Sequence, residues 1–115
     1  MRLIRIDHVS LNVADRRRSI AWYEDVLGMR AHGAPGPADE PVFLGAAPVR
    51  LALFADLAPG LRHVALATDA AGQRRVRDRL EHLALPYRAE RHRDSDSMYF
   101  RDPDGHTVEV MVPTA

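Results

Sequence analysis

The sequence predicts an α+β protein made of two tandem βαβββ modules, residues 1–56 and 57–115, that form a single domain. Two observations lead to this prediction. Strand-like and helix-like hydrophobic periods follow one another in the same order in both halves of the chain. In addition, the dipeptide His8-Val9 of the first predicted strand recurs as His63-Val64 about half a chain later, which indicates an internal duplication.

The first module begins with a strand, because apolar and polar residues alternate over residues 4–13. A helix is expected over residues 15–27, since Asp15 is a suitable N-cap and Gly28 suits the left-handed conformation that ends many helices. The other predicted elements of this module are a weak strand over 29–33, a Pro- and Gly-rich loop or mobile flap over 34–41, and strands over 42–46 and 49–55.

The second module repeats this order, starting with an alternating strand over residues 61–68. A helix over 70–84 follows, in which Val76, Leu80 and Leu83 form an apolar stripe opposite a solvated face rich in Arg. The remaining predicted elements are strands over 86–91, 97–101 and 107–112, the last entered through the turn Asp102-Pro103-Asp104-Gly105.

The composition is that of an ordinary globular protein, with 46% hydrophobic and 28% charged residues. The 16 basic and 16 acidic residues cancel, so we expect neither nucleic acid nor an anionic membrane as a partner. The absence of Lys and Cys excludes Schiff-base chemistry, thiolate nucleophiles, disulfides and zinc-finger clusters. No run approaches the roughly 20 apolar residues of a membrane span and the N-terminus lacks a signal-peptide core, so we expect a cytoplasmic protein.

Three residues stand out as candidate metal ligands. Glu109 lies at the centre of the strand over 107–112, and a carboxylate buried there needs a partner such as a cation. His8 and His63 each lie at the centre of a strand whose other face is covered by branched apolar residues. Two imidazoles and one carboxylate on a rigid sheet bind divalent metals and leave positions open for substrate. The alternative interpretation is that each is a half-buried residue whose hydrogen bonds the protein itself satisfies.

Four segments of the chain carry a family resemblance, namely residues 6–13, 19–29, 62–66 and 99–109. They resemble the vicinal oxygen chelate superfamily, which includes glyoxalase I, fosfomycin resistance proteins, bleomycin resistance proteins and extradiol dioxygenases. The resemblance implies that the modules form a curved mixed sheet around a cleft, with the helices on its outer face. It also implies that His8, His63 and Glu109 bind a divalent metal ion, namely Mn, Zn, Ni or Fe(II).

The resemblance further implies roles for residues around the metal. Glyoxalase I typically adds a carboxylate ligand at the end of the first module, a place that Phe54 takes here if it is equivalent to Glu109 in the duplication. Ser97 and Tyr99 match hydroxyl residues that hold the substrate in fosfomycin resistance proteins. We expect catalytic roles for Glu109 and Tyr99, with Glu109 doubling as a base. The expected substrate-binding residues are Ser97, Tyr99, Arg50, Arg101, Asn12 and Phe54; for Asn12 and the two Arg the alternative is an ordinary surface position.

These features together favour a small metal-dependent enzyme that chelates neighbouring oxygens of a substrate and stabilises an oxyanion or enolate, as a lyase, isomerase or thiol transferase. One alternative is a metal-free protein of the bleomycin-resistance type that binds a small molecule. A further alternative is an Fe(II) extradiol dioxygenase. The resemblance also implies a homodimer in which His8 of one chain joins His63 and Glu109 of the other.

Overall fold

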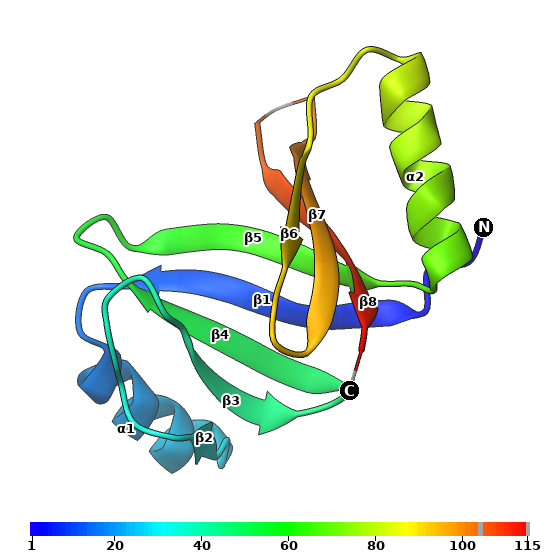
Figure 1. Cartoon of the computed structure of the whole chain (residues 1–115). Helices are drawn as coiled ribbons and strands as arrows, with labels where there is room; N and C mark the ends of the chain where they lie inside the picture. The colour runs from blue at the N-terminus through cyan, green and yellow to red at the C-terminus, as the bar shows by residue number, and fades with distance from the viewer. Residues whose placement is uncertain (104, 115) are drawn as a thin grey trace. The chain divides into compact units, whose positions relative to one another are not determined.

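The computed structural model describes residues 1–103 and 105–114. These residues form two helices and eight strands in the order β1-α1-β2-β3-β4-β5-α2-β6-β7-β8 (Figure 1). The α+β class and the repeated βαβββ order are therefore confirmed. No helix in the described part of the chain is long and apolar enough to cross a membrane.

The chain divides into two compact units. The N-terminal unit comprises Asp7–Arg62, and the C-terminal unit comprises His63–Ala115 together with Met1–Ile6. One boundary therefore falls within β1 (Arg5–Val13) and the other within β5 (Gly60–Ala67). The residues at the start of the chain belong to the C-terminal unit because Ile4 N donates to Ala67 O at 2.8 Å and Thr68 Oγ1 donates to Arg2 O at 2.9 Å.

The strands of the N-terminal unit lie in the order β2-β3-β4-β1. Strand β1 pairs with β4 in parallel, and the other pairs are antiparallel. The bounds of the other elements are α1 Arg16–Leu27, β2 Ala31–His32, β3 Val42–Ala46 and β4 Val49–Ala55. The predicted bounds of β3 and β4 are the observed ones, and the predicted strand over 29–33 is only two residues long.

Helix α1 packs on one face of the β3-β4 hairpin. Leu44 and Leu53 are fully buried there, and Ile20 and Tyr23 of the helix contact this cluster. The predicted ends of the helix are confirmed, because the Asp15 side chain accepts from Arg18 N at 3.1 Å and Gly28 has a φ of 67°.

The loop over residues 34–41 is tied to this helix by Arg16. Although it is charged, Arg16 is buried, and its guanidinium donates to the backbone carbonyls of Gly36 and Glu40. A buried guanidinium requires such acceptors, since an unpaired charge in the interior is costly. The sequence predicts a loop or mobile flap here, and in the structure two carbonyls of this loop are hydrogen-bonded to α1.

The C-terminal unit repeats the same strand pattern in the order β5-β8-β7-β6. Its first and last strands, β5 and β8, pair in parallel, as β1 and β4 do, and the other pairs are antiparallel. The bounds are α2 Ala70–His82, β6 Arg88–Arg91, β7 Ser95–Arg101 and β8 Thr107–Pro113. In the turn before β8, Gly105 N donates to Asp102 O at 3.0 Å, while residue 104 lies outside the described residues.

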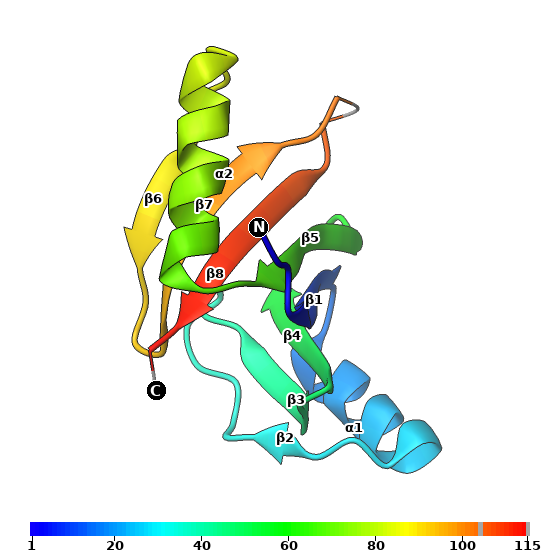
Figure 2. The same cartoon turned by 90° about the vertical axis from the view of Figure 1, so that its right-hand side faces the viewer.

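Helix α2 covers one face of β7 and β8 (Figure 2). The Gln73 amide fixes it there by donating to the carbonyls of Asp96 and Val110, at 3.0 and 3.1 Å. Leu80 is buried, as its place in the apolar stripe predicts. Leu83 is 50% exposed, contrary to the prediction, because the helix ends at His82 and the chain turns away at Ala84, which has a φ of 55°.

Replacing Gly45 tests the tight hairpin between β3 and β4. Gly45 has a φ of 80°, and a Cβ there would collide with the Val49 carbonyl oxygen and lie 2.9 Å from Met29 Cε. Gly33 is a matched control, because its φ is 90° but nothing lies within 4 Å of its Cβ position. Chemical denaturation should show that Gly45→Ala is less stable than Gly33→Ala by about 1–3 kcal/mol. Equal losses for both variants would contradict this packing.

Candidate metal centre

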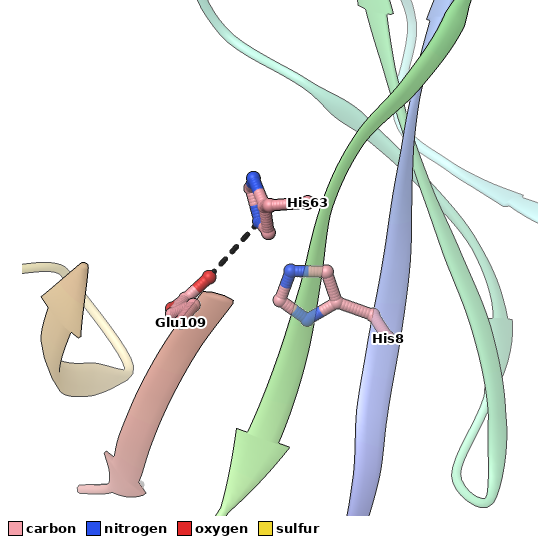
Figure 3. A group of neighbouring side chains, drawn as sticks. All are labelled: His8, His63 and Glu109. Carbon is pink, nitrogen blue, oxygen red and sulfur yellow. Dashed lines mark ion pairs between the residues drawn. The ribbon is translucent and has the colours of Figure 1, made fainter. Parts of the chain in front are cut away.

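The C-terminal unit holds a buried carboxylate beside a buried imidazole. Glu109 of β8 is 3% exposed and His63 of β5 is 7% exposed. Their side chains meet, with His63 Nε2 at 3.0 Å from Glu109 Oε1 (Figure 3). Both residues lie inside their strands and not at the strand ends. The two strands pair in parallel, with Ala65 of β5 opposite Glu109 of β8.

Hydroxyl groups of β7 hold the Glu109 carboxylate. Ser97 Oγ donates to Glu109 Oε2 at 2.7 Å, and the Ser95 hydroxyl lies 3.2 Å from that of Ser97. Tyr99 is the direct antiparallel partner of Glu109, and its phenol oxygen lies 2.7 Å from His92 Nε2. Burial raises the pKa of the Tyr99 phenol, and the negative charge of Glu109 raises it further. The phenol therefore keeps its proton at neutral pH.

The separation of the two ligand atoms fits a shared metal ion. Metal bonds to His and Glu are about 2.0–2.2 Å long, so two such ligands at a right angle lie about 3 Å apart. The distance from His63 Nε2 to Glu109 Oε1 is 3.0 Å. Imidazole together with carboxylate suits Mn, Zn, Ni and Fe(II). A direct hydrogen bond between an imidazole and a carboxylate has the same length, so the distance is compatible with a bound metal ion and equally with a metal-free contact.

His8 of β1 occupies the corresponding place in the N-terminal unit and is 7% exposed. Its Nδ1 lies 2.8 Å from the Asp7 carboxylate, which also accepts from Arg50 Nη1 at 3.1 Å. The Phe43 ring meets the imidazole edge-on, with the centroids 5.4 Å apart. Strand alternation puts the neighbouring side chains of Asp7 and His8 on opposite faces, so periodicity alone does not predict this contact.

The other predicted site residues divide between the two units. Asn12, Arg50 and Phe54 belong to the N-terminal unit, whereas Ser97, Tyr99 and Arg101 belong to the C-terminal unit. Arg62 donates to Asn12 Oδ1 at 3.1 Å and lies 3.9 Å above the centre of the Phe54 ring. Arg101 Nη1 donates to the Gly105 carbonyl at 3.1 Å.

The expected equivalence of Phe54 and Glu109 is wrong. Glu109 pairs with Ala65, two residues after His63, whereas the residue two after His8 is Ser10, and Ser10 pairs with Ala52. The pairing register thus differs by two residues between the modules, a shift that the sequence offset does not reveal. A shift of two keeps side chains on the same face. Ala52, like Phe54, has no group that binds a metal.

Solved structures share this fold at low sequence identity. Methylmalonyl-CoA epimerase from Mycobacterium tuberculosis matches with a TM-score of 0.78 and 22% identity, over 98% of this chain and 90% of that chain. The Streptomyces coelicolor methylmalonyl-CoA epimerase matches with a TM-score of 0.75 and 17% identity, over 99% and 100%. An extradiol ring-cleaving dioxygenase from B. fuscum matches with a TM-score of 0.83 and 18% identity, over 98% of this chain but only 33% of that chain.

At these identities the structures establish the fold alone. A family model provides independent evidence, because it matches residues 5–110 and so spans nearly all of both modules. The four segments that carry the resemblance in the sequence lie within this range. The chain belongs to the Glyoxalase/Bleomycin resistance protein/Dioxygenase superfamily.

Proposed function

We propose that the protein is a small metal-dependent enzyme in which His8, His63 and Glu109 together hold one divalent cation. The observation that carries the proposal is the buried contact between His63 and Glu109, whose ligand atoms are 3.0 Å apart. The three residues form a group of ligand types that suits a metal ion. Each is less than a tenth exposed, so such an ion would replace much of the solvation these polar groups lose on folding.

The contact between Asp7 and His8 supports a ligand role for His8. In metal centres, a ligating His usually donates its second ring nitrogen to a carboxylate or carbonyl, which fixes the tautomer and the ring orientation. The Asp7 carboxylate at 2.8 Å from Nδ1 has this position, and Arg50 Nη1 donates to the same carboxylate oxygen, Oδ2, at 3.1 Å. The arrangement makes Nε2 the nitrogen of His8 that would bind a metal.

The bound metal would supply Lewis acidity to two neighbouring oxygens of a small substrate. The surrounding side chains supply the remaining functions. Tyr99 keeps its proton, since the pKa of its phenol is raised, and a substrate oxygen would replace His92 as its hydrogen-bond partner. Ser97 orients the Glu109 carboxylate from Oε2. Glu109, held in this way, also serves as the base, and the reaction belongs to the lyase, isomerase or thiol-transferase classes.

Metal titration of chelator-treated protein tests the ligand set. Isothermal titration with Mn(II), Zn(II), Ni(II) or Fe(II) should show one site per chain for at least one of these ions. His63→Ala and Glu109→Gln should each weaken binding by about 100-fold or more. The control is His106→Ala, because His106 is exposed and pairs with Asp102. Absence of binding by all four ions would contradict the proposal and favour a metal-free binding protein.

A substitution at Asp7 tests its role in orienting His8. Asp7→Asn keeps the size of the side chain but removes the charge that faces Nδ1, so metal affinity should fall by about 10–100-fold. Asp78→Asn, on the exposed face of α2, is the control. If Asp7→Asn binds metal as tightly as the wild type while His8→Ala does not, then Asp7 has no orienting role.

We further propose that the protein is a homodimer in which His8 of one chain completes the centre formed by His63 and Glu109 of the other. Mixing two inactive variants distinguishes this arrangement from a centre within one chain. A mixed dimer of His8→Ala and His63→Ala chains has one intact centre if the ligands come from different chains. It has none if they come from the same chain. Refolding the two variants together should thus restore metal binding, up to one metal ion per mixed dimer. If no metal binding returns, the shared site is contradicted.

A further inference from the structure

A cavity of about 560 Å³ lies within the C-terminal unit, at the edge of its sheet. Its wall includes Leu85 and Pro86 from the segment before β6, Arg88 of β6, Tyr99 and Arg101 of β7, and Thr107 of β8. This volume falls within the range of small-molecule sites, which is roughly 300–1,000 Å³. None of the residues proposed as metal ligands lines it.

The charges in this cavity are of one sign. Arg88 and Arg101 line it, and no acidic residue is among its lining residues in the described part of the chain. The Arg88 guanidinium lies 4.8 Å from the centre of the Tyr99 ring and 3.4 Å from the Glu90 carboxylate. Arg101 donates to the Gly105 carbonyl. A guanidinium carries five N–H donors, more than these contacts use, and it binds carboxylates and phosphates in a forked geometry.

Another part of the wall is apolar and partly uncovered, while Tyr87 and Thr107 add hydroxyl groups to the lining. Leu85 is 47% exposed, and Pro86 and Phe100 lie beside it in the wall. Burial of an apolar group of a ligand against such side chains is favourable, at about 25 cal/mol per Å². The cavity therefore combines a cationic part with an apolar part, which suits an amphipathic anion better than an inorganic ion.

The register of the strands places this cavity beside Glu109. Arg88 pairs with Tyr99, and Tyr99 pairs with Glu109, so the three side chains form a row on one face across β6, β7 and β8. Tyr99 lines the cavity and is also the direct cross-strand neighbour of Glu109. Only the Tyr99 side chain would thus separate a molecule bound in the cavity from Glu109, one of the proposed metal ligands.

We propose that this cavity binds an organic anion through Arg88 and Arg101, with the apolar body of the ligand against Leu85 and Pro86. The ligand class is a carboxylate or phosphate monoester carried on a compact apolar group. Because the cavity adjoins Glu109 through Tyr99, we also infer that this anion is part of the substrate. That step rests on the proposed function. The binding of the anion itself requires no metal.

Titration calorimetry on the full chain with benzoate and benzamide tests the proposal. The two probes have nearly the same shape but differ in charge, so benzoate should bind at least tenfold more tightly. Phenyl phosphate is a third probe, and whether it or benzoate binds more tightly identifies the preferred anion. Shifts of the Tyr99 and Thr107 amide resonances on addition of the anion would place it in the cavity.

Matched Arg substitutions identify the groups that bind the anion. Arg88→Met and Arg101→Met keep the apolar stem of each side chain and should each weaken benzoate binding about tenfold or more. Arg91→Met is the control, because Arg91 is on the same strand as Arg88, has an 87% exposed side chain and pairs with Asp96 outside the cavity. Circular dichroism would confirm that the variants fold.

The outcomes separate this proposal from the proposed metal centre. Benzoate binding that persists in chelator and depends on Arg88 and Arg101 supports the anion site, whether or not the metal titration succeeds. Equal binding of benzoate and benzamide would overturn it. An equal loss in Arg91→Met would also overturn it, since the anion would then respond only to surface charge. Loss of benzoate binding in chelator would do so as well, because the anion would then be bound to the metal.

Discussion

The Glu109 carboxylate is the group on which the candidate metal centre depends. It is buried at the centre of a strand, where a carboxylate without partners would be strongly destabilising. Its oxygens instead contact the His63 ring and the Ser97 hydroxyl. Such a carboxylate is costly to retain for stability alone, since apolar residues of similar size fill cores at least as well. The proposed metal ion would explain why a carboxylate occupies this position.

The repeated strand pairing places each candidate histidine in the same element of its unit. In each unit the first strand pairs in parallel with the last, and each candidate histidine lies on that first strand. A central strand holds its side chains more firmly than a loop does, which favours metal coordination and precise proton transfer. The supporting residues differ between the units, however. Asp7 and Arg50 support His8, whereas hydroxyl groups support Glu109.

Hydrophobic periodicity and cap residues predict most of the fold, because both are local properties of the chain. The strands over 42–46 and 49–55 and the caps at Asp15 and Gly28 appear as predicted. The features that were missed depend on distant parts of the chain. The burial of Arg16 requires carbonyls of a loop more than one element away. Likewise, a period of two gives the face of a strand but not its register, so the pairing of Ala52 with Ser10 was not foreseeable.

The same distinction applies to the site, since residue types predict the candidate ligands but not the groups that orient them. The central claim is that two imidazoles and one carboxylate bind one cation. X-ray absorption spectroscopy of Zn(II)-loaded protein measures this directly, because scattering from the outer carbons of imidazole counts the histidine ligands. The account predicts two imidazoles in the wild type and one in His8→Ala. A wild-type spectrum with one imidazole or none, or a count unchanged in His8→Ala, would contradict it.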